Sequence, residues 1–311
     1  MAGVGAEEGK LIWMDGRLVD WREARVHFVS NSLQYGYSVF EGIRAYRTDE
    51  GTAVFRLDAH IDRLLGSAKI IGLTVPFDRA ALLAACCETV AANGYPECYI
   101  RPVVYIGEGG MGLDARNCKV NVGIAVWEWG EYLGAGKLAR GIRVQTTSFT
   151  RHHVNSNMTK AKAGGNYMLF QMARTDALRR GYDEALFLDA AGHVAEGSVE
   201  NVFIVRGGEL ITPPLTYILE GITRDAIIRL ARARGLVVRE EFFSRDTVYL
   251  CDEAFFVGTG AEVTPVVEAD DRPVGDGKPG PITKALQQLF FDTVRGRNPA
   301  FREWLTPVRR S

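Results

Sequence analysis

The pattern of apolar residues changes at a glycine-containing stretch near the middle of the chain, and this change constrains the fold more than any other feature. Before residues 130–141, short apolar runs surround two amphipathic segments. After residue 141, segments with the apolar spacing of a strand alternate with segments that have the apolar spacing of a helix. The stretch itself, GEYLGAGKLARG, sustains neither period. A chain of 311 residues also exceeds the usual size of one domain. We therefore predict two domains, residues 1–129 and 142–311, joined by a linker at 130–141.

The N-terminal part is predicted to be a small α+β domain. Asp15 and Gly16 separate two apolar runs, which favours a hairpin. Apolar residues then recur at helical spacing in two segments, and two later segments are rich in β-branched and aromatic residues. The expected elements are a hairpin at 11–19, helices at 58–73 and 78–92, and strands at 98–106 and 120–127.

The C-terminal part is predicted to be mixed α/β, because apolar runs of strand length alternate with amphipathic segments that stop at glycine. The expected strands are 143–147, 184–188, 236–243 and 254–258, with a hairpin at 202–211, and the expected helices are 166–180, 223–234 and 281–294.

Charge and cysteine content exclude several classes of protein. The 37 Lys and Arg nearly balance the 38 Asp and Glu, so no net positive field attracts nucleic acid or an anionic membrane. Five cysteines without paired C-x-x-C motifs favour a reducing compartment, and the adjacent His152 and His153 lack a third ligand at metal-binding spacing. Residues 1–10 lack the basic and apolar regions of a signal peptide. We expect a cytoplasmic protein without metal.

Several local patterns could carry chemistry. Lys160 and Lys162 lie among small residues, Glu196 precedes an apolar strand, Thr223 begins an amphipathic helix, and a small-residue turn occupies 258–262. A helix start can bind an anion, and small residues let backbone approach a ligand. Each pattern also has an ordinary structural explanation: surface lysines, a solvated turn carboxylate, a helix N-cap and a strand end. Taken singly, these patterns leave both interpretations open.

Taken together and in order, the motifs resemble one family. The segments that carry the resemblance are YGYSVFEGIR at 35–44, HIDRL at 60–64, YIRP at 99–102, KAGGNY at 162–167, EG at 196–197, EGITR at 220–224 and GTGAE at 258–262. From about Leu11 to its end, the chain resembles the branched-chain amino acid aminotransferases, which are pyridoxal phosphate enzymes of fold type IV. The resemblance implies a two-domain fold like that of D-amino acid aminotransferase.

The resemblance also implies how the cofactor, pyridoxal 5'-phosphate, is held. Lys162 would form the Schiff base and later move a proton; Lys160 is the competing amine, but the AGGNY run follows Lys162. Glu196 would pair with the pyridine nitrogen and keep it protonated. The other implied cofactor-binding residues are Arg63, Tyr167, Leu219, Gly221, Ile222, Thr223 and Thr259.

For the substrate, the resemblance implies one pocket that accepts both aliphatic and acidic side chains. Arg101 would meet the side-chain carboxylate of glutamate. Tyr35 and Leu113 would come from a neighbouring subunit, which implies a homodimer or an oligomer of dimers. Gly260 departs from the alanine common in the family. The implied substrate-binding residues are Tyr35, Phe40, Tyr99, Arg101, Leu113, Trp129, Tyr132, Thr259 and Gly260.

The implied reaction is transfer of the amino group from leucine, isoleucine or valine to 2-oxoglutarate, giving branched-chain 2-oxo acids and L-glutamate. Enzymes of the same fold that act on D-amino acids or (R)-amines, and aminodeoxychorismate lyase, would share Lys162, Arg63 and Glu196. A pyridoxal phosphate-binding regulator is the non-enzymatic alternative, although such a module would not need the complete acid and base set. The segments around Phe40 and Tyr99 favour the branched-chain enzyme.

Overall fold

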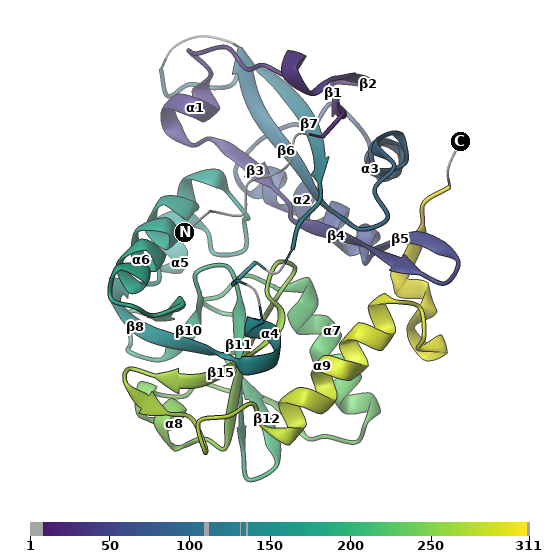
Figure 1. Ribbon diagram of the computed structural model, residues 1–311. Helices are drawn as coiled ribbons and strands as arrows, with labels where there is room; N and C mark the ends of the chain where they lie inside the picture. The colour runs from purple at the N-terminus through teal and green to yellow at the C-terminus, as the bar shows by residue number, and fades with distance from the viewer. Residues whose placement is uncertain (1–8, 109–111, 131, 135, 310–311) are drawn as a thin grey trace. The chain divides into compact units, whose positions relative to one another are not determined.

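The computed structural model describes residues 9–108, 112–130, 132–134 and 136–309, and its described part divides into two compact units. Unit 1 holds the described residues up to 129, residues 161–167 and those from 293 onward, and unit 2 holds 130–160 and 168–292. Both units mix helices and strands, as predicted (Figure 1). Residues 131 and 135 of the predicted linker and residues 1–8 lie outside the described part.

Unit 1 is built on one antiparallel sheet with the strand order β17-β5-β4-β6-β7-β1-β2, and β3 pairs with β6. Its elements are β1 (Leu11–Met14), β2 (Arg17–Asp20), η1 (Trp21–Glu23), α1 (Asn31–Tyr35), β3 (Ser38–Phe40), β4 (Ile43–Thr48), β5 (Gly51–Phe55), α2 (Leu57–Ile70), α3 (Arg79–Asn93), β6 (Cys98–Glu108), β7 (Lys119–Trp127), η2 (Gly164–Asn166), η3 (Pro299–Trp304) and β17 (Leu305–Pro307).

Successive side chains along the strands of unit 1 lie on opposite faces of its sheet. Along β6, Cys98, Ile100 and Val104 are buried in one core with apolar residues of α2 and α3. Because successive strand residues point to opposite faces, Tyr99 and Arg101 lie on the face away from that core. The sheet thereby presents the two predicted substrate residues together.

Unit 2 contains a second sheet whose central strands close into a ring. Its elements are α4 (Lys137–Arg140), β8 (Ile142–Thr150), α5 (Val154–Asn157), α6 (Tyr167–Arg179, whose first residue groups with unit 1), β9 (Glu184–Leu188), β10 (Val194–Gly197), β11 (Asn201–Arg206), β12 (Glu209–Thr212), α7 (Ile222–Ala233), β13 (Val238–Glu240), α8 (Arg245–Leu250), β14 (Glu253–Gly258), β15 (Glu262–Ala269), β16 (Arg272–Pro273) and α9 (Pro281–Val294, which ends in unit 1).

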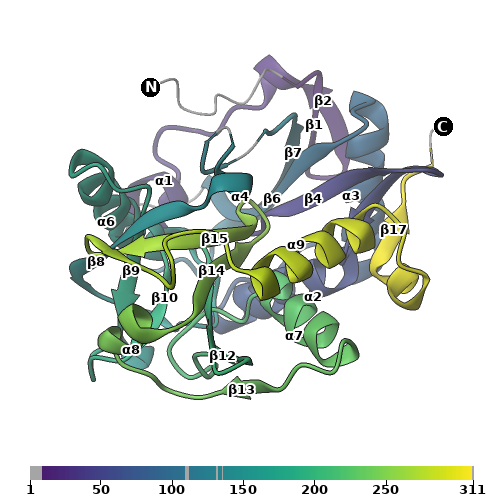
Figure 2. The same cartoon turned by 60° about the horizontal axis from the view of Figure 1, so that its bottom comes forward.

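The strand order in unit 2 is β10-β9-β8-β15-β14-β11-β12-β13, and β10 also pairs with β11 through Glu196 and Asn201. That extra pairing closes β10, β9, β8, β15, β14 and β11 into a barrel-like ring. Figure 2 labels five of these strands, β8, β9, β10, β14 and β15. The ring is filled by apolar side chains such as Val202, Phe256 and Val266. A rigid closed sheet of this kind fixes the loops at its rim.

The structure differs from the sequence predictions in several places. The predicted strand at 236–243 is confined to Val238–Glu240, and β10 and β15 have no counterpart among the expected strands. Residues 161–167 and the chain from 293 onward group with unit 1, although the sequence pattern placed them in the C-terminal domain. The physical cause is pairing across long sequence distances, since β17 joins β5 and Val39 bridges Ala163.

Candidate active site

The loop that carries Lys162 is bound to strand β3 in unit 1. The N–H of Phe40 donates to the carbonyl of Lys162 at 3.1 Å, and the Lys162 N–H donates to Ser67 Oγ at 3.0 Å. Gly36 has a positive φ of 68°, and a Cβ there would lie 2.9 Å from Gly165 Cα. Glycine is therefore required where the two backbones meet. These contacts fix the backbone on which the lysine side chain stands.

The amine of Lys162 lies beside Tyr167, a predicted cofactor residue, and Phe40, a predicted substrate residue. Lys162 Nζ donates to Tyr167 Oη at 2.5 Å and lies 5.1 Å from the ring centroids of Phe40 and Tyr167. The two rings pack edge to face at 4.7 Å. Withdrawal of the amine from water, together with the charge of Arg63, lowers the pKa of Lys162 from 10.5 to about 8. This amine can lose its proton near neutral pH.

Arg63 on α2 is held by a carboxylate that the sequence motifs did not single out. Glu41 is fully buried and accepts from Arg63 Nε at 2.6 Å and from Nη2 at 2.8 Å, while His60 Nδ1 lies 2.7 Å from the same carboxylate. Burial alone would raise the pKa of Glu41, but the charge and hydrogen bonds of Arg63 and the hydrogen bond of His60 hold it well below the usual range. Burial lowers the pKa of His60, so its neutral ring donates through Nδ1. Arg63 therefore has a fixed orientation.

Arg101 is enclosed by aromatic rings in unit 1. Its guanidinium carbon lies 4.6 Å from the ring centroid of Phe40, 5.3 Å from that of Tyr99 and 5.9 Å from that of Trp127. Nη2 donates to Tyr99 Oη at 3.3 Å, whereas Nε is buried with no hydrogen-bond partner in the described part of the chain. The predicted residue Trp129 packs on Tyr99 with centroids 4.0 Å apart. The structure thus brings Phe40, Tyr99, Arg101 and Trp129 together.

Two of the predicted substrate residues lie on the surface of unit 1. Tyr35 at the end of α1 is 46% exposed, and Leu113 is 87% exposed. The Asn31 side chain donates to the carbonyl of Gly112 at 3.0 Å, which joins α1 to the loop that carries Leu113. Their contact with substrate remains a prediction, because it requires a second subunit.

In unit 2, Glu196 on β10 is buried and oriented by three donors. Its Oε1 accepts from Arg151 Nε at 2.6 Å, and its Oε2 accepts from Asn201 Nδ2 and the Leu219 N–H, both at 3.1 Å. The explanation of Glu196 as a solvated turn residue is therefore wrong, since the residue is only 5% exposed. A carboxylate held this way can meet a further donor without rearranging.

Helix α7 begins beside the same network. Its N-cap is Gly221, and a Cβ there would lie 1.8 Å from Asn201 Oδ1, so glycine is needed for the close approach. The interpretation of Thr223 as the N-cap is wrong, because Thr223 lies inside the first turn and is buried. Gly221 has no side chain to cap the helix, and the first N–H groups of a helix, here from Ile222, have no intrahelical acceptor. Such a helix start is suited to an anion.

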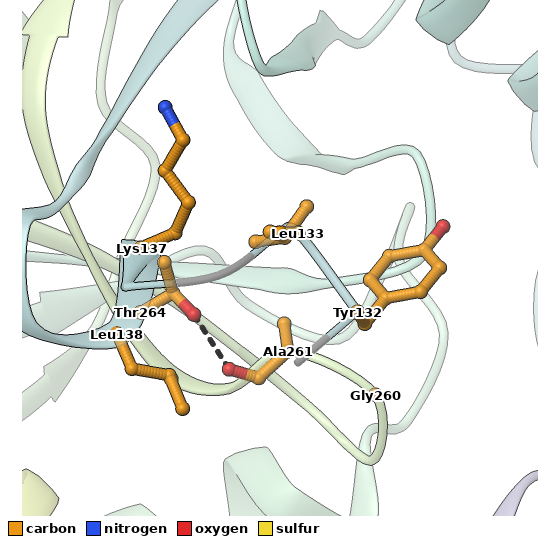
Figure 3. Close-up of a pocket in the computed structure, with 8 residues that line it drawn as sticks. Tyr132, Leu133, Lys137, Leu138, Gly260, Ala261 and Thr264 are labelled. Carbon is orange, nitrogen blue, oxygen red and sulfur yellow. Dashed lines mark hydrogen bonds between the residues drawn. The ribbon is translucent and has the colours of Figure 1, made fainter. Parts of the chain in front are cut away.

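The turn between β14 and β15 carries Thr259 and Gly260 against Tyr132. A Cβ at Gly260 would lie 3.3 Å from Tyr132 Cγ, which explains why glycine fits where the family often has alanine. Tyr132 and Gly260 border a small pocket (Figure 3). Its other lining residues are Leu133, Gly134, Lys137, Leu138, Ala261 and Thr264.

The competing amine, Lys160, is occupied by structural contacts in unit 2. Its Nζ donates to the carbonyl of Leu215 and lies 3.3 Å from Glu220 Oε1. An ammonium in these contacts holds a loop together. The contacts favour Lys162 as the reactive amine.

Sequence reasoning missed Glu41, His60, Arg151 and Asn201, which orient the predicted residues. His60 lies three residues before Arg63 on α2, so helical spacing could have indicated its place beside Arg63. Glu41 stood inside a recognised motif but on another element, and Arg151 and Asn201 carried no signal of their own. No group of three or more His, Cys, Asp and Glu side chains in the described residues could hold a metal ion. No helix within the described ranges is long and apolar enough to cross a membrane.

Comparison with known proteins agrees with this arrangement. Residues 38–269 match the family model for amino-transferase class IV. A branched-chain-amino-acid aminotransferase of Pseudomonas aeruginosa is 49% identical over 304 residues, covering 98% of this chain and 99% of the relative. The chain therefore belongs to the class IV aminotransferase family, and the predicted recognition is confirmed.

Solved structures extend the likeness to the fold. The Escherichia coli branched-chain amino acid aminotransferase superposes with a TM-score of 0.95 at 44% identity, covering 97% of this chain and all of that one. The branched-chain amino acid aminotransferase of Thermobaculum terrenum, solved in its pyridoxal phosphate form, gives a TM-score of 0.90 at 37% identity, covering 97% and 100%. Within the family, the relatives thus point to the branched-chain aminotransferases in particular, and the predicted fold type is confirmed.

Proposed function

We propose that this chain is a pyridoxal phosphate-dependent transaminase that moves the amino group of leucine, isoleucine or valine to 2-oxoglutarate. The products are the branched-chain 2-oxo acids and L-glutamate. The proposal is supported by the branched-chain aminotransferases that it resembles over nearly their full length. It is also supported by the chemistry of the residues in each unit.

The observation that carries the proposal is the Arg101 guanidinium among the rings of Phe40, Tyr99 and Trp127. Aromatic walls favour an aliphatic side chain through burial of apolar surface. A guanidinium whose Nε lacks a partner within the described chain offers a charge-assisted hydrogen bond to a carboxylate. One wall can thereby serve both the branched-chain donor and glutamate.

The residues present fit pyridoxal phosphate. Lys162 offers an amine with a pKa of about 8, Tyr167 Oη lies beside it, and Arg63 is a cation suited to phosphate. When bound, this cofactor supplies an aldehyde carbon for exchange of amines and a conjugated ring that spreads the electron pair left at the substrate Cα. Lys162 Nζ would take up and return the proton at that carbon, since its pKa lies near neutrality.

The residues of unit 2 would hold the rest of the cofactor. Glu196, fixed by Arg151 and Asn201, would accept from the pyridine N–H. The first turn of α7, with Ile222 and Thr223, and the turn at Thr259 would supply N–H and hydroxyl donors to the phosphate. Leu219 would pack against the ring, and Gly260 with Tyr99 would bind the α-carboxylate.

We also infer a homodimer. Exposed apolar residues lie on and around α1 in unit 1, including Phe28 at 76%, Leu33 at 62% and Leu113 at 87%. A second copy covering them would remove this apolar surface from water and could bring Tyr35 to its partner's substrate. Combining Leu33→Glu with Leu113→Glu should convert a dimer into a monomer in light scattering, whereas Val237→Glu should not. A dimer that persists in the double variant would contradict the inference.

A reducing compartment such as the cytoplasm is supported by the cysteines, all of which are free thiols in the described chain. Burial raises the pKa of Cys98 to about 12 and that of Cys251 to about 12, which keeps both protonated and unreactive. Thiol titration of the denatured protein without reductant should count five thiols.

A substrate panel tests the proposed reaction. The amino donors are L-leucine, L-valine, L-isoleucine, D-alanine and (R)-1-phenylethylamine, with 2-oxoglutarate or pyruvate as acceptor. We expect the three branched-chain L-amino acids with 2-oxoglutarate to give the highest kcat/KM. Faster turnover of D-alanine or the amine, or pyruvate release from aminodeoxychorismate, would assign the chain to a different enzyme of the same fold.

A further inference from the structure

A buried group of charges in unit 2 has no part in the reaction described above. Glu184 on β9 is fully buried, and Glu200, just before β11, is 2% exposed. Arg174 on α6 points its Nε to Glu184 Oε2 at 3.3 Å, as an ion pair without the alignment of a hydrogen bond. Burial raises the pKa of both carboxyl groups in spite of Arg174. Arg174 is thus the cation that pairs with Glu184 in this group.

The same guanidinium reaches the predicted substrate loop. Arg174 Cζ lies 4.2 Å from the ring centroid of Tyr132, which is close enough for a cation–π contact. Tyr132 also packs against Gly260, where an added Cβ would lie 3.3 Å from its Cγ and 3.5 Å from its Cβ. Figure 3 shows Tyr132 and Gly260 on adjoining segments at the edge of the small pocket.

The loop that carries Tyr132 is also held farther along the chain, because Leu133 packs against the apolar core of unit 2 and Lys137 Nζ pairs with Asp183 Oδ1 at 2.9 Å. Gly134 and Gly136 have positive φ angles of 107° and 76°, a backbone conformation that glycine adopts without the steric cost of a side chain. The ring of Tyr132 contacts Arg174 from α6 and Gly260 from the turn between β14 and β15, and both contacts restrict where this loop can lie. Arg174 is in turn paired with the fully buried Glu184, whose backbone lies within β9.

We propose that Arg174, anchored by Glu184, is a positioning residue that holds Tyr132 against the Gly260 turn and thereby sets the affinity for substrate. The inference rests on the proposed place of Tyr132 and Gly260 in the substrate site. Arg174 itself contacts no substrate in this account. Its effect passes through the ring of Tyr132, so it should change substrate binding and leave the chemistry at Lys162 intact.

A double-mutant cycle on the holoenzyme tests the proposal. Arg174→Lys retains a cation for Glu184 but loses the flat guanidinium that stacks on Tyr132. We expect it to raise KM for L-leucine and Kd for the unreactive acid 4-methylpentanoate by about 3- to 30-fold, the range of a cation–π contact. The kcat should stay within about twofold. In the Tyr132→Leu background the same substitution should have no further effect on either constant.

The controls separate the possible failures. Arg180→Lys alters an exposed ion pair with Asp176 on the same helix and should change neither constant. If Tyr132→Leu alone leaves KM unchanged, the placement of Tyr132 in the substrate site is wrong, and the proposal falls with it. If Tyr132→Leu raises KM but Arg174→Lys acts equally in both backgrounds, or not at all, the substrate site stands and the role of Arg174 is overturned.

Discussion

Glu41 and Arg63 form a bidentate ion pair inside unit 1, with Nε to Oε1 at 2.6 Å and Nη2 to Oε2 at 2.8 Å. The pair fixes the plane of the guanidinium that we propose to bind the cofactor phosphate. Glu41→Gln can keep at most part of this geometry and removes the charge. We expect the Kd for pyridoxal phosphate to rise about 10- to 100-fold, measured by quenching of tryptophan fluorescence in the apoprotein.

A matched control for Glu41 is Asp62, which forms an exposed ion pair with Arg79 at 2.6 Å. Asp62→Asn should leave the Kd for the cofactor unchanged, because exposed pairs contribute little. Equal affinity of Glu41→Gln and the wild type would show that Arg63 does not need its partner to bind phosphate.

The lowered pKa of Lys162 has a consequence for stability. Protonated Lys162 is more stable in the unfolded chain than in the folded site. The free energy of unfolding of the apoprotein is therefore lowered below the folded-state pKa of about 8. Between pH 8 and 10.5 the unfolded state binds more protons, so stability contributed by this group rises with pH. Apo Lys162→Met should have a higher Tm than wild type at pH 7, and the gap should narrow by pH 10.

Lys160→Met is the matched control in this series, because Lys160 is bound to Glu220 and the carbonyl of Leu215. Its Tm should lie below that of the wild type at pH 7. A Tm difference for Lys162→Met that stays constant from pH 7 to pH 10 would contradict the lowered pKa.

Glu196→Gln should slow the chemical step by orders of magnitude, because an amide cannot stabilise a protonated pyridine nitrogen as a carboxylate does. The Kd for the cofactor should change less, since phosphate contacts are kept. Single-turnover absorbance with L-leucine measures the step directly. Glu220→Gln changes an exposed carboxylate of the same unit and should react at the wild-type rate. An unchanged rate in Glu196→Gln would remove Glu196 from its proposed role.

Arg101→Leu should separate the two halves of the reaction. A buried carboxylate without its partner costs about 3 to 5 kcal/mol, so kcat/KM for glutamate should fall by two or more orders of magnitude. The half-reaction with L-leucine should stay within about tenfold, and the exposed Arg47→Leu should change neither. Equal losses for leucine and glutamate in stopped-flow measurements would mean that Arg101 supports the fold instead.

Local periodicity predicted the elements that bury one face. The helices at 58–73 and 78–92 appear as α2 and α3, and the strand at 98–106 appears as β6. Strands such as β10 and β15 were missed, because β10 is only four residues long and buried throughout, and β15 is buried for most of its length, so neither shows the alternation of a half-exposed strand. The grouping of 161–167 with unit 1 depends on the bonds of Phe40 to Lys162 across the chain, which no local pattern contains.

The site was predicted from motifs rather than from periodicity. Lys162 and Tyr167 were expected together and lie 2.5 Å apart, and Phe40 and Arg101 lie on one wall. The motifs indicated the residues that we propose to contact a ligand. Glu41 and Arg151 instead orient other side chains, those of Arg63 and Glu196. Such a role is set by packing between elements and has no spacing of its own.

The central claim is that Lys162 carries the cofactor. The most direct measurement is borohydride reduction of the holoenzyme followed by peptide mass spectrometry, which marks the lysine bonded to pyridoxal phosphate. We predict that the pyridoxyl group maps to Lys162 and is absent from the reduced Lys162→Ala variant. A pyridoxyl group on Lys160, or one retained in Lys162→Ala, would contradict the account.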